Sequence, residues 1–303
     1  DDWGSWKLKK DPEFILSLKK AGCEVYTTIK PRFPFGIRDF NYRDHRKICV
    51  IDGKIGYVGG INIADEYIHK GKLGYWRDTH LRIQGAAVYM LQMIFAIGWM
   101  LRTDEMLLGR GHFPTDVENT GESMIQIAAS GADTPQETIY QAYFYAIAQA
   151  KNTVYIETPY FIPDESILTA LKAAAMAGVD VRIIFPQKSD HATVHEASLS
   201  YLEELMRLGA KVYFYQKGFI HSKMLLVDNE MASVGTANMD IRSFMLNSEI
   251  NAFIYDKETV GRLYRVFADD LTDCRQAKKA EVTQKFLPQR IWRSVCRLFS
   301  PVL

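Results

Sequence analysis

An internal repeat is the feature that most constrains how this chain can fold. Residues 45–52 and 221–228 both read His-x-Lys-x-x-x-x-Asp, and each copy runs on into a Gly-x-x-Asn sequence that ends at Asn62 or Asn238. The spacing from histidine to asparagine is seventeen residues in both copies. One copy alone is a weak signal, but two copies with matched tails at the same distance predict a duplicated structural unit.

The repeat divides the chain into two homologous lobes. We expect the first lobe to span residues 1–115 and the second to span residues 122–303, with a hinge in the polar stretch 109–122, which contains glycine and proline. The first lobe has too few residues before His45 to hold the elements expected in the second. We therefore expect that residue 1 is not the natural start of the protein and that upstream sequence is missing.

Strands and helices alternate along the second lobe, which is typical of an α/β fold. Apolar, β-branched stretches predict strands, and helical stretches that stop at a glycine predict helices. The expected strands are residues 124–128, 153–157 and 179–185, and the expected helices are residues 137–151, 164–177 and 197–208. The predicted fold class is α/β, with two homologous lobes, each a mixed β-sheet flanked by helices, related by a pseudo-twofold axis.

Each motif places a histidine and a lysine at the start of an apolar strand. Side chains alternate along a strand, so His45 and Lys47 point to one face, and His221 and Lys223 do the same in the second copy. Each strand should end in a hairpin turn, since the motif aspartate is followed by glycine or asparagine. The return strand then brings the motif asparagine back near the histidine and lysine.

Asp52 and Asp228 complete the two motifs and belong to the candidate catalytic set, although their place in the turns favours a structural role. The imidazole, ammonium and carboxamide groups of one copy suit a phosphodiester. Lysine offers a point charge to a non-bridging oxygen, asparagine offers a neutral donor, and histidine serves as nucleophile or general acid near neutrality. Two copies across one phosphate would supply an attacking group and a protonating group.

Composition excludes several classes of partner. The 303-residue chain has a formal net charge of only +1, so no global field argues for nucleic acid, and no nucleic-acid partner is expected. Its four cysteines form no Cys-x-x-Cys pair and no zinc-like cluster with histidine, so free buried thiols are expected. His191 and His195 lie four residues apart, but no third ligand is evident. We expect no metal and no cofactor, and a role for these two histidines near the entrance of the site or on the surface stays open.

Three segments bear on membranes. Residues 86–101 are strongly apolar but fall short of the roughly 18 to 20 residues that span a bilayer, so they predict a buried core helix. Residues 275–297 hold seven Lys/Arg and one acid. A basic amphipathic helix is predicted there, because one helical stripe carries Ile291, Val295, Leu298 and Phe299, with Arg290, Arg293 and Arg297 elsewhere on the helix. Such a helix suits an anionic lipid surface or docks on the protein body, and both can hold. Residues 31–38, which include Phe33 and Phe35, mix apolar and basic side chains and are expected to line a lipid entrance.

The paired motifs resemble those of the phospholipase D superfamily, over nearly the whole chain. The resemblance implies two phospholipase D-like lobes that build one site between them, in which one histidine forms a covalent phosphohistidine and the other acts first as acid and then as base. It assigns His45 as the nucleophile. It implies that Asp78 and Glu249 orient the imidazoles, and that the phosphate is bound by Lys47, Lys223, Asn62 and Asn238.

Longer stretches resemble the bacterial cardiolipin synthases, namely residues 59–67, 76–80, 157–163, 238–243 and 299–303. The resemblance implies transfer of a phosphatidyl group from one phosphatidylglycerol to a hydroxyl of another, with release of glycerol. It further implies an anionic phospholipid and a membrane surface as partners, at the bacterial cell membrane with the catalytic part on the cytoplasmic side. The oligomeric state, and phosphatidylethanolamine as an alternative donor or acceptor, stay open.

Two other functions compete with this interpretation. A phospholipase D-type phosphodiesterase that hydrolyses a lipid or a nucleic acid would share the covalent step and differ only in using water as the acceptor. The near-neutral charge disfavours a nuclease. A catalytically silent membrane-binding module is the other alternative, and it would not require two intact motifs.

Overall fold

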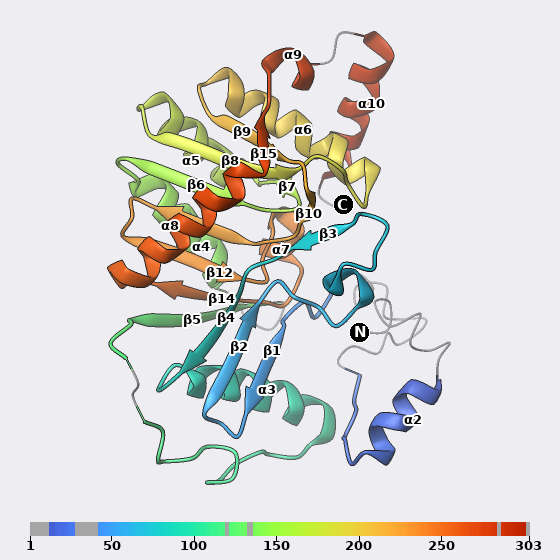
Figure 1. The fold of residues 1–303 in the computed structure, drawn as a ribbon, viewed down its shortest axis with the longest axis vertical. Coiled ribbons are helices and arrows are strands. Elements are labelled where there is room, and N and C mark those ends of the chain that lie inside the picture. The colour runs from blue at the N-terminus through green and yellow to red at the C-terminus, as the bar shows by residue number, and fades with distance from the viewer. Residues whose placement is uncertain (1–11, 28–41, 119–120, 132–135, 284–285, 301–303) are drawn as a thin grey trace.

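A large mixed sheet and a small sheet beside it organise the molecule (Figure 1). The structure, a computed structural model, describes residues 12–27, 42–118, 121–131, 136–283 and 286–300. The large sheet has eight strands in the order β15-β9-β8-β6-β11-β12-β14-β5. These strands are β5 (Ile125–Ser130), β6 (Thr153–Glu157), β8 (Asp180–Pro186), β9 (Lys211–Tyr215), β11 (Met224–Val227), β12 (Met231–Gly235), β14 (Glu249–Ile254) and β15 (Cys274–Gln276).

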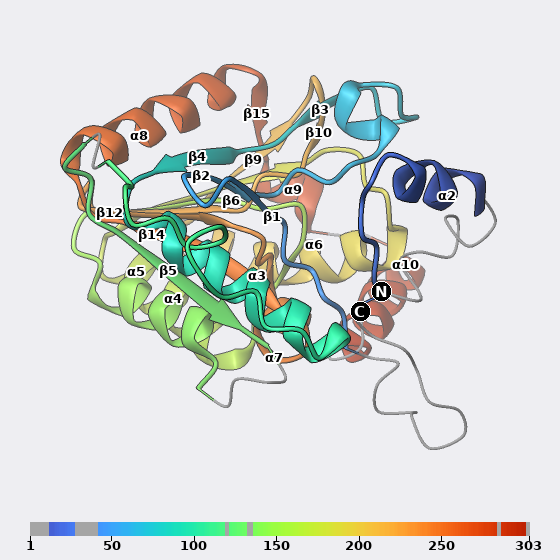
Figure 2. The same ribbon diagram turned by 90° about the horizontal axis from the view of Figure 1, so that it is seen from below.

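Helices cover both faces of the large sheet (Figure 2). On one face lie α4 (Thr138–Gln149), α5 (Glu165–Met176) and α6 (Ala192–Arg207), and on the other lies α8 (Lys257–Thr272). A separate buried apolar cluster forms beneath each set of helices. This arrangement confirms the predicted α/β class, with a mixed sheet flanked by helices.

Local sequence explains where these elements begin and end. Asp164 caps α5, since its carboxylate accepts hydrogen bonds from the backbone N–H groups of Ser166 and Ile167. Gly178 follows the helix with a φ of +90°, a conformation that glycine adopts without strain. The helix expected at residues 197–208 begins earlier, at Ala192, and its buried residues begin at Ala197.

The small sheet has the order β1-β2-β4 and is formed by β1 (Ile48–Ile51), β2 (Ile55–Gly59) and β4 (His80–Gln84). It contains the first motif and lies within the expected first lobe 1–115, whereas the large sheet lies within the expected second lobe 122–303. The division into these two lobes, and the pseudo-twofold axis between them, stay predictions.

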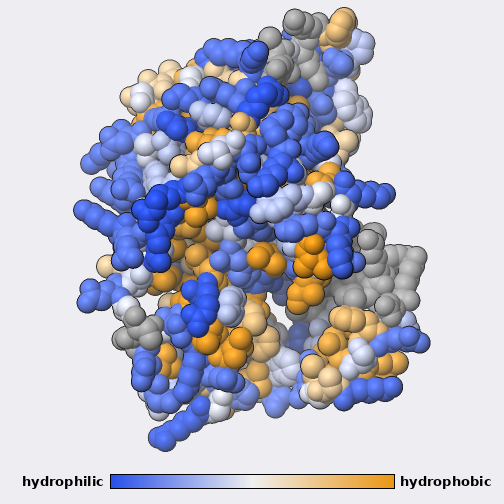
Figure 3. Space-filling model, in the orientation of Figure 1, coloured by the Kyte–Doolittle hydropathy of each residue, from blue (hydrophilic) through white to orange (hydrophobic). Residues whose placement is uncertain are grey.

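The apolar helix predicted at residues 86–101 is present as α3 (Val88–Thr103), but it is not buried all round. Val88 and Leu91 pack into the core beside β1 and β2. Phe95 and Ile97 are 43% and 46% exposed, so the expectation of a fully buried core helix is wrong. Apolar residues gather on the surface over the part of the molecule that holds α3 and the small sheet (Figure 3).

Two short parallel strand pairs lie beside the sheets. The first pairs β3 (Tyr75–Arg77) with β10 (Gly218–Ile220), and the second pairs β7 (Phe161–Ile162) with β13 (Met239–Asp240). The pair β3–β10 joins the region of the first motif to that of the second. The remaining elements are α2 (Pro12–Lys20), the 3₁₀ helix η2 (Asp65–Ile68), α7 (Ile241–Met245), α9 (Lys279–Val282) and α10 (Leu287–Leu298).

Membrane-related expectations have mixed outcomes. Among the described residues, every helix is too short or too polar to cross a bilayer. The predicted C-terminal amphipathic helix is present as α10 and docks on α6. The expected lipid-entrance segment 31–38 lies outside the described residues.

Candidate active site

His45 lies just before β1, in an extended segment that is held by the opposite half of the chain. Its backbone N–H donates to the carbonyl of Ser248 over 2.9 Å. Its imidazole Nδ1 lies 2.9 Å from both carboxylate oxygens of Glu249, the first residue of β14. The contact joins residues that are 204 positions apart in the sequence.

His221 has the same arrangement with the two halves exchanged. Its backbone N–H donates to the carbonyl of Arg77 over 2.7 Å, and its Nδ1 lies 2.8 Å from Oδ2 of Asp78. In both copies, therefore, the histidine N–H bonds to the residue directly before the carboxylate that contacts its imidazole. Each predicted carboxylate orients the histidine of the other copy, which sequence order did not indicate.

The glycine of each Gly-x-x-Asn sequence permits this close packing. A Cβ on Gly59 would lie 2.5 Å from the carbonyl oxygen of Thr79, and one on Gly235 would lie 2.4 Å from that of Ile250. Thr79 and Ile250 directly follow Asp78 and Glu249. Only glycine lets these strands approach so closely.

Burial gives the two carboxylate–imidazole pairs different electrostatics. Burial lowers the pKa of His221 well below its usual value, and the nearby Lys223 lowers it further. Burial also raises the pKa of Asp78 to about 6, against the effect of Lys223. Although burial opposes its charge, the facing His45 holds the pKa of Glu249 below its usual value. A neutral His221 and an ionised Glu249 follow at neutral pH.

Each motif lysine donates from Nζ to the backbone carbonyl of its own histidine, Lys223 over 2.5 Å, and Lys223 also contacts the imidazole ring. The Nζ of Lys223 lies 2.9 Å from Nδ1 and 3.0 Å from Nε2 of His221. The Nζ of Lys47 donates to the backbone carbonyl of His45 over 2.7 Å. Burial lowers the pKa of Lys223 to about 7 and that of Lys47 to about 8. Without a bound anion nearby, it costs free energy to bury either lysine in its charged ammonium form.

The motif asparagines differ as well. Asn62 donates from Nδ2 to the hydroxyl of Tyr67 over 2.7 Å, and this hydroxyl lies 3.3 Å from Nδ1 of His221. Asn238 is buried, and its Oδ1 has no hydrogen-bond partner in the described part of the chain. Both asparagines lie at the strand ends where the hairpin geometry predicted them.

Both histidines line one cavity of about 830 Å³. Asn62 also lines it, together with several residues that sequence reasoning did not assign, namely Tyr67, Lys70, Lys72, Trp76, Tyr160 and Asp190. Tyr67 and Trp76 contact the His221 ring at centroid distances of 5.6 Å and 5.5 Å. Both lie in stretches that carry the family resemblance, which was the only sequence signal for them.

The motif aspartates lie away from this cavity, at the far ends of the hairpins. Asp52 and Asp228 adopt positive φ values of 53°, as the turns require. The carboxylate of Asp228 accepts backbone N–H groups of Lys151, Asn152 and Thr153, over 2.7 to 2.8 Å. Both aspartates therefore lie in turns outside the cavity lining, and the contacts of Asp228 favour the structural role that its place in the turn suggested.

A buried ionic cluster lies behind His221. Arg77 donates from Nε to Oδ1 of Asp270 over 2.8 Å, which ties β3 to α8. Burial and the charge of Asp270 raise the pKa of the fully buried Glu157 to about 8, against the effect of Arg77. The cluster fixes the backbone from which Asp78 projects.

Other histidines and candidate metal ligands fall outside the site. His191 directly precedes α6, without a capping hydrogen bond from its side chain, and His195 lies within the first turns of that helix, where burial lowers its pKa. Within the described ranges, no group of three or more His, Cys, Asp or Glu side chains could hold a metal ion.

The mixed sheet with two crossed histidine–carboxylate pairs on one cavity defines a class of protein. The chain is similar to proteins of the phospholipase D superfamily. Its fold is similar to that of the phosphatidylserine synthase of Haemophilus influenzae, with a TM-score of 0.68 at 16% identity, covering 88% of this chain and 72% of that one.

Within the superfamily, residues 143–271 match the family model described as cardiolipin synthase, PLD-like domain. The chain is 47% identical to cardiolipin synthase 2 of Bacillus cereus and to the major cardiolipin synthase of Bacillus subtilis, over all of its own length. It is 46% identical to the cardiolipin synthase of Geobacillus kaustophilus. The chain spans only 59% to 63% of the length of these relatives.

Proposed function

We propose that this chain carries the catalytic site of a cardiolipin synthase. The enzyme would transfer a phosphatidyl group from one phosphatidylglycerol to a hydroxyl of a second and release glycerol. The observation that carries the proposal is the pair of imidazoles on one cavity, each held at Nδ1 by a buried carboxylate. Relatives named cardiolipin synthase, at 46% to 47% identity, support the choice of reaction.

In the first step, His45 is the nucleophile. Because Glu249 holds Nδ1, the free Nε2 faces the substrate and attacks phosphorus. The bond from phosphorus to the glycerol oxygen breaks, and His221 donates a proton to that oxygen. An anionic phosphate beside His221 opposes the effects of burial and of Lys223, so substrate binding favours the protonated form that this step needs.

In the second step, the neutral His221 removes the proton from a hydroxyl of the second phosphatidylglycerol. That oxygen attacks phosphorus, and the bond from phosphorus to His45 breaks. Lys47 and Lys223 neutralise charge on the non-bridging oxygens in both steps, and Asn62 and Asn238 donate to the same oxygens.

Product analysis by mass spectrometry tests this proposal. The protein is incubated with phosphatidylglycerol vesicles, and a His45→Ala variant serves as the control. Formation of cardiolipin and glycerol by the wild type, and not by the variant, supports the transfer reaction. Phosphatidic acid alone would mean that water is the acceptor and that the protein is a hydrolase. No product from folded protein on this donor, or on phosphatidylethanolamine, would favour a silent membrane-binding module.

A further inference from the structure

In α10, two of the three arginines contact the protein body. A helix that binds lipid through its arginines would turn them outward. Arg293 is only 6% exposed and donates from Nε to Glu196 of α6 over 3.1 Å. Arg297 pairs with Glu204, and its guanidinium carbon lies 4.3 Å from the ring centroid of Tyr201. Arg293 and Arg297 therefore anchor α10 to α6, whereas Arg290, one turn earlier, is exposed.

The apolar stripe of α10 faces outward. Ile291, Trp292 and Leu298 are 55%, 50% and 79% exposed. Ile291 and Leu298 each follow an arginine by one residue, so each lies about 100° round the helix from that arginine. Large apolar side chains next to one another at this exposure mark an interaction surface.

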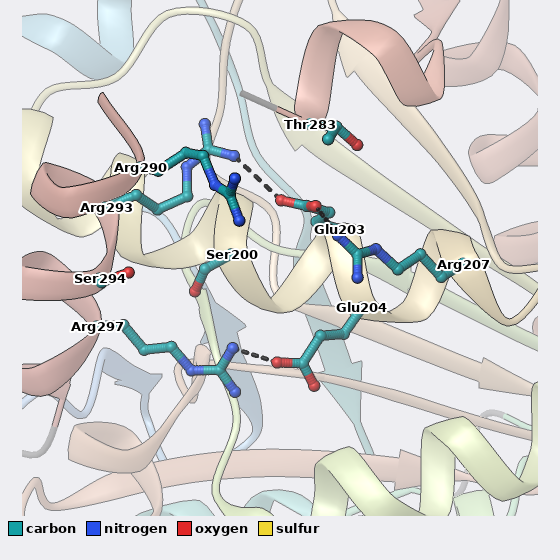
Figure 4. A pocket seen from close by; sticks show the side chains of 9 residues that line it. All are labelled: Ser200, Glu203, Glu204, Arg207, Thr283, Arg290, Arg293, Ser294 and Arg297. Carbon is teal, nitrogen blue, oxygen red and sulfur yellow. Dashed lines mark hydrogen bonds and ion pairs between the residues drawn. The ribbon is translucent and has the colours of Figure 1, made fainter. Parts of the chain in front are cut away.

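A cleft of about 350 Å³ lies between α6 and α10 (Figure 4). Its charged lining is four arginines against two glutamates, namely Arg207, Arg290, Arg293, Arg297, Glu203 and Glu204. The guanidinium groups of Arg207, Arg290 and Arg293 gather around Glu203 (Figure 4). The guanidinium of Arg290 has no hydrogen-bond or ion-pair partner among the residues that the structure describes, although its backbone N–H donates to the carbonyl of Phe286. The cleft thus holds excess positive charge, with one guanidinium available to an anion.

An anionic phospholipid matches both parts of this surface. Its phosphate suits the free guanidinium of Arg290, and its acyl chains suit the outward stripe of Ile291, Trp292 and Leu298. The surface also lies on the side of the molecule that carries η2, which lines the catalytic cavity (Figures 1 and 2). Ile63 and Ile68, beside and within η2, are exposed as well.

We propose that α10 and the cleft between α6 and α10 form a docking surface for an anionic bilayer, separate from the catalytic cavity. Arg290 binds a headgroup phosphate, and the outer residues of α10 insert among acyl chains. The inference rests on the proposed function, since a lipid substrate requires the cavity to meet a bilayer. Insertion of apolar side chains dominates this binding, because most arginines are already paired with glutamates.

Co-sedimentation with vesicles tests the surface. Replacing Ile291, Trp292 and Leu298 together by serine should weaken binding to phosphatidylglycerol vesicles by at least about 10-fold. A matched control replaces three equally exposed apolar residues elsewhere, Leu108, Met124 and Met176, and should leave binding unchanged. Arg290→Ala should weaken binding to phosphatidylglycerol vesicles about 5-fold and spare binding to phosphatidylcholine vesicles. Arg110→Ala replaces an exposed arginine of the first half and should leave binding to both kinds of vesicle unchanged.

Several outcomes would overturn the proposal. Unchanged vesicle binding by the triple variant would do so. So would a wild-type affinity that vanishes at high salt, because that would mean electrostatic binding alone. A variant that turns a dimer into a monomer without changing vesicle binding would make the surface an interface between copies. Binding of inorganic phosphate at Arg290, with vesicle binding intact in Arg290→Ala, would make the cleft a site for soluble anions.

Activity in detergent micelles separates this proposal from the proposed function. The triple variant should keep about its wild-type turnover of dispersed phosphatidylglycerol, because the cavity is unchanged. His45→Ala should lose turnover and still bind vesicles. If the wild-type protein is inactive with both vesicles and micelles, the proposed function fails. The difference in vesicle binding between the wild type and the triple variant still tests the role of α10.

Discussion

The two copies of the motif share their local geometry and differ in their surroundings. In each copy, the histidine N–H bonds to the residue before a carboxylate from the other copy, and the imidazole contacts that carboxylate. The first copy sits on a three-stranded sheet and leaves 27% of the His45 side chain exposed. The second sits in the eight-stranded sheet and leaves 9% of the His221 side chain exposed. Two histidines with the same local geometry can thus have different chemical roles because they differ in burial. This difference supports a nucleophilic role for the more exposed His45 and an acid–base role for the more buried His221.

The largest expected effect comes from removing either histidine. His45→Ala and His221→Ala should each lower kcat by about 10⁴-fold, since one removes the nucleophile and the other the acid and base. The two variants should nevertheless differ in a quenched reaction. Mass spectrometry should find the phosphatidyl adduct on His45 in the His221→Ala protein and no adduct in the His45→Ala protein. An adduct on another residue would reverse the assignment.

The lysines should separate activity from stability. Lys47→Met and Lys223→Met should each lower kcat by about 10² to 10³-fold, because each removes a charge beside the phosphate. Lys223→Met should also stabilise the fold near pH 7 by on the order of 1 kcal/mol, and Lys47→Met, which is less buried, by less. The folded pKa of Lys223 is about 7, well below its usual value, so the unfolded chain binds more protons between about pH 7 and 10.

It follows that wild-type stability should rise with pH across this window, and that the gain from Lys223→Met should shrink toward pH 10. Denaturant melts of the wild type and both variants at several pH values provide the measurement. A Lys223→Met protein that is less stable than wild type at pH 7 would count against an uncompensated buried ammonium.

The crossed carboxylates should have smaller effects. Asp78→Asn and Glu249→Gln should each lower kcat by about 10 to 100-fold, by freeing the imidazole that each carboxylate orients. The acid limb of the pH–rate profile should move in Asp78→Asn if this carboxylate controls His221, and the rate of adduct formation should fall in Glu249→Gln if that carboxylate controls His45. Swapped effects would mean that each carboxylate serves its own copy.

The turn aspartates should affect stability alone. Asp228→Ala should cost about 1 kcal/mol or more, because three backbone N–H groups lose their acceptor, whereas Asp52→Ala should cost less. These hydrogen bonds outweigh burial and lower the pKa of Asp228, so the stabilisation is present above about pH 4 and is lost as the pH falls below that. Thermal melts at pH 3 and pH 7 measure it, and kcat at pH 7 should not change.

Sequence reasoning predicted the parts of the site that depend on short-range order. The placement of His45 and Lys47 before a strand, the turns at Asp52 and Asp228, and the return of the asparagines follow from strand periodicity and turn chemistry. The crossing of Asp78 and Glu249 could not be predicted from the same rules, since it depends on how two distant strands dock. The exposed side of α3 was missed, and the face by which α10 docks stayed open, for a related reason. Composition shows that a helix has an apolar stripe and does not show which partner covers it.

The crossed pairing also determines when, during translation, the two histidine–carboxylate contacts can form. His45 leaves the ribosome 204 residues before Glu249, the carboxylate that will hold its imidazole. At roughly 5 to 20 residues per second, the first motif waits on the order of 10 to 40 seconds for its partner. A nascent chain that stalls or is cut before β14 therefore carries an unrestrained His45, so the two pairs can both be in place only after β14 has been translated.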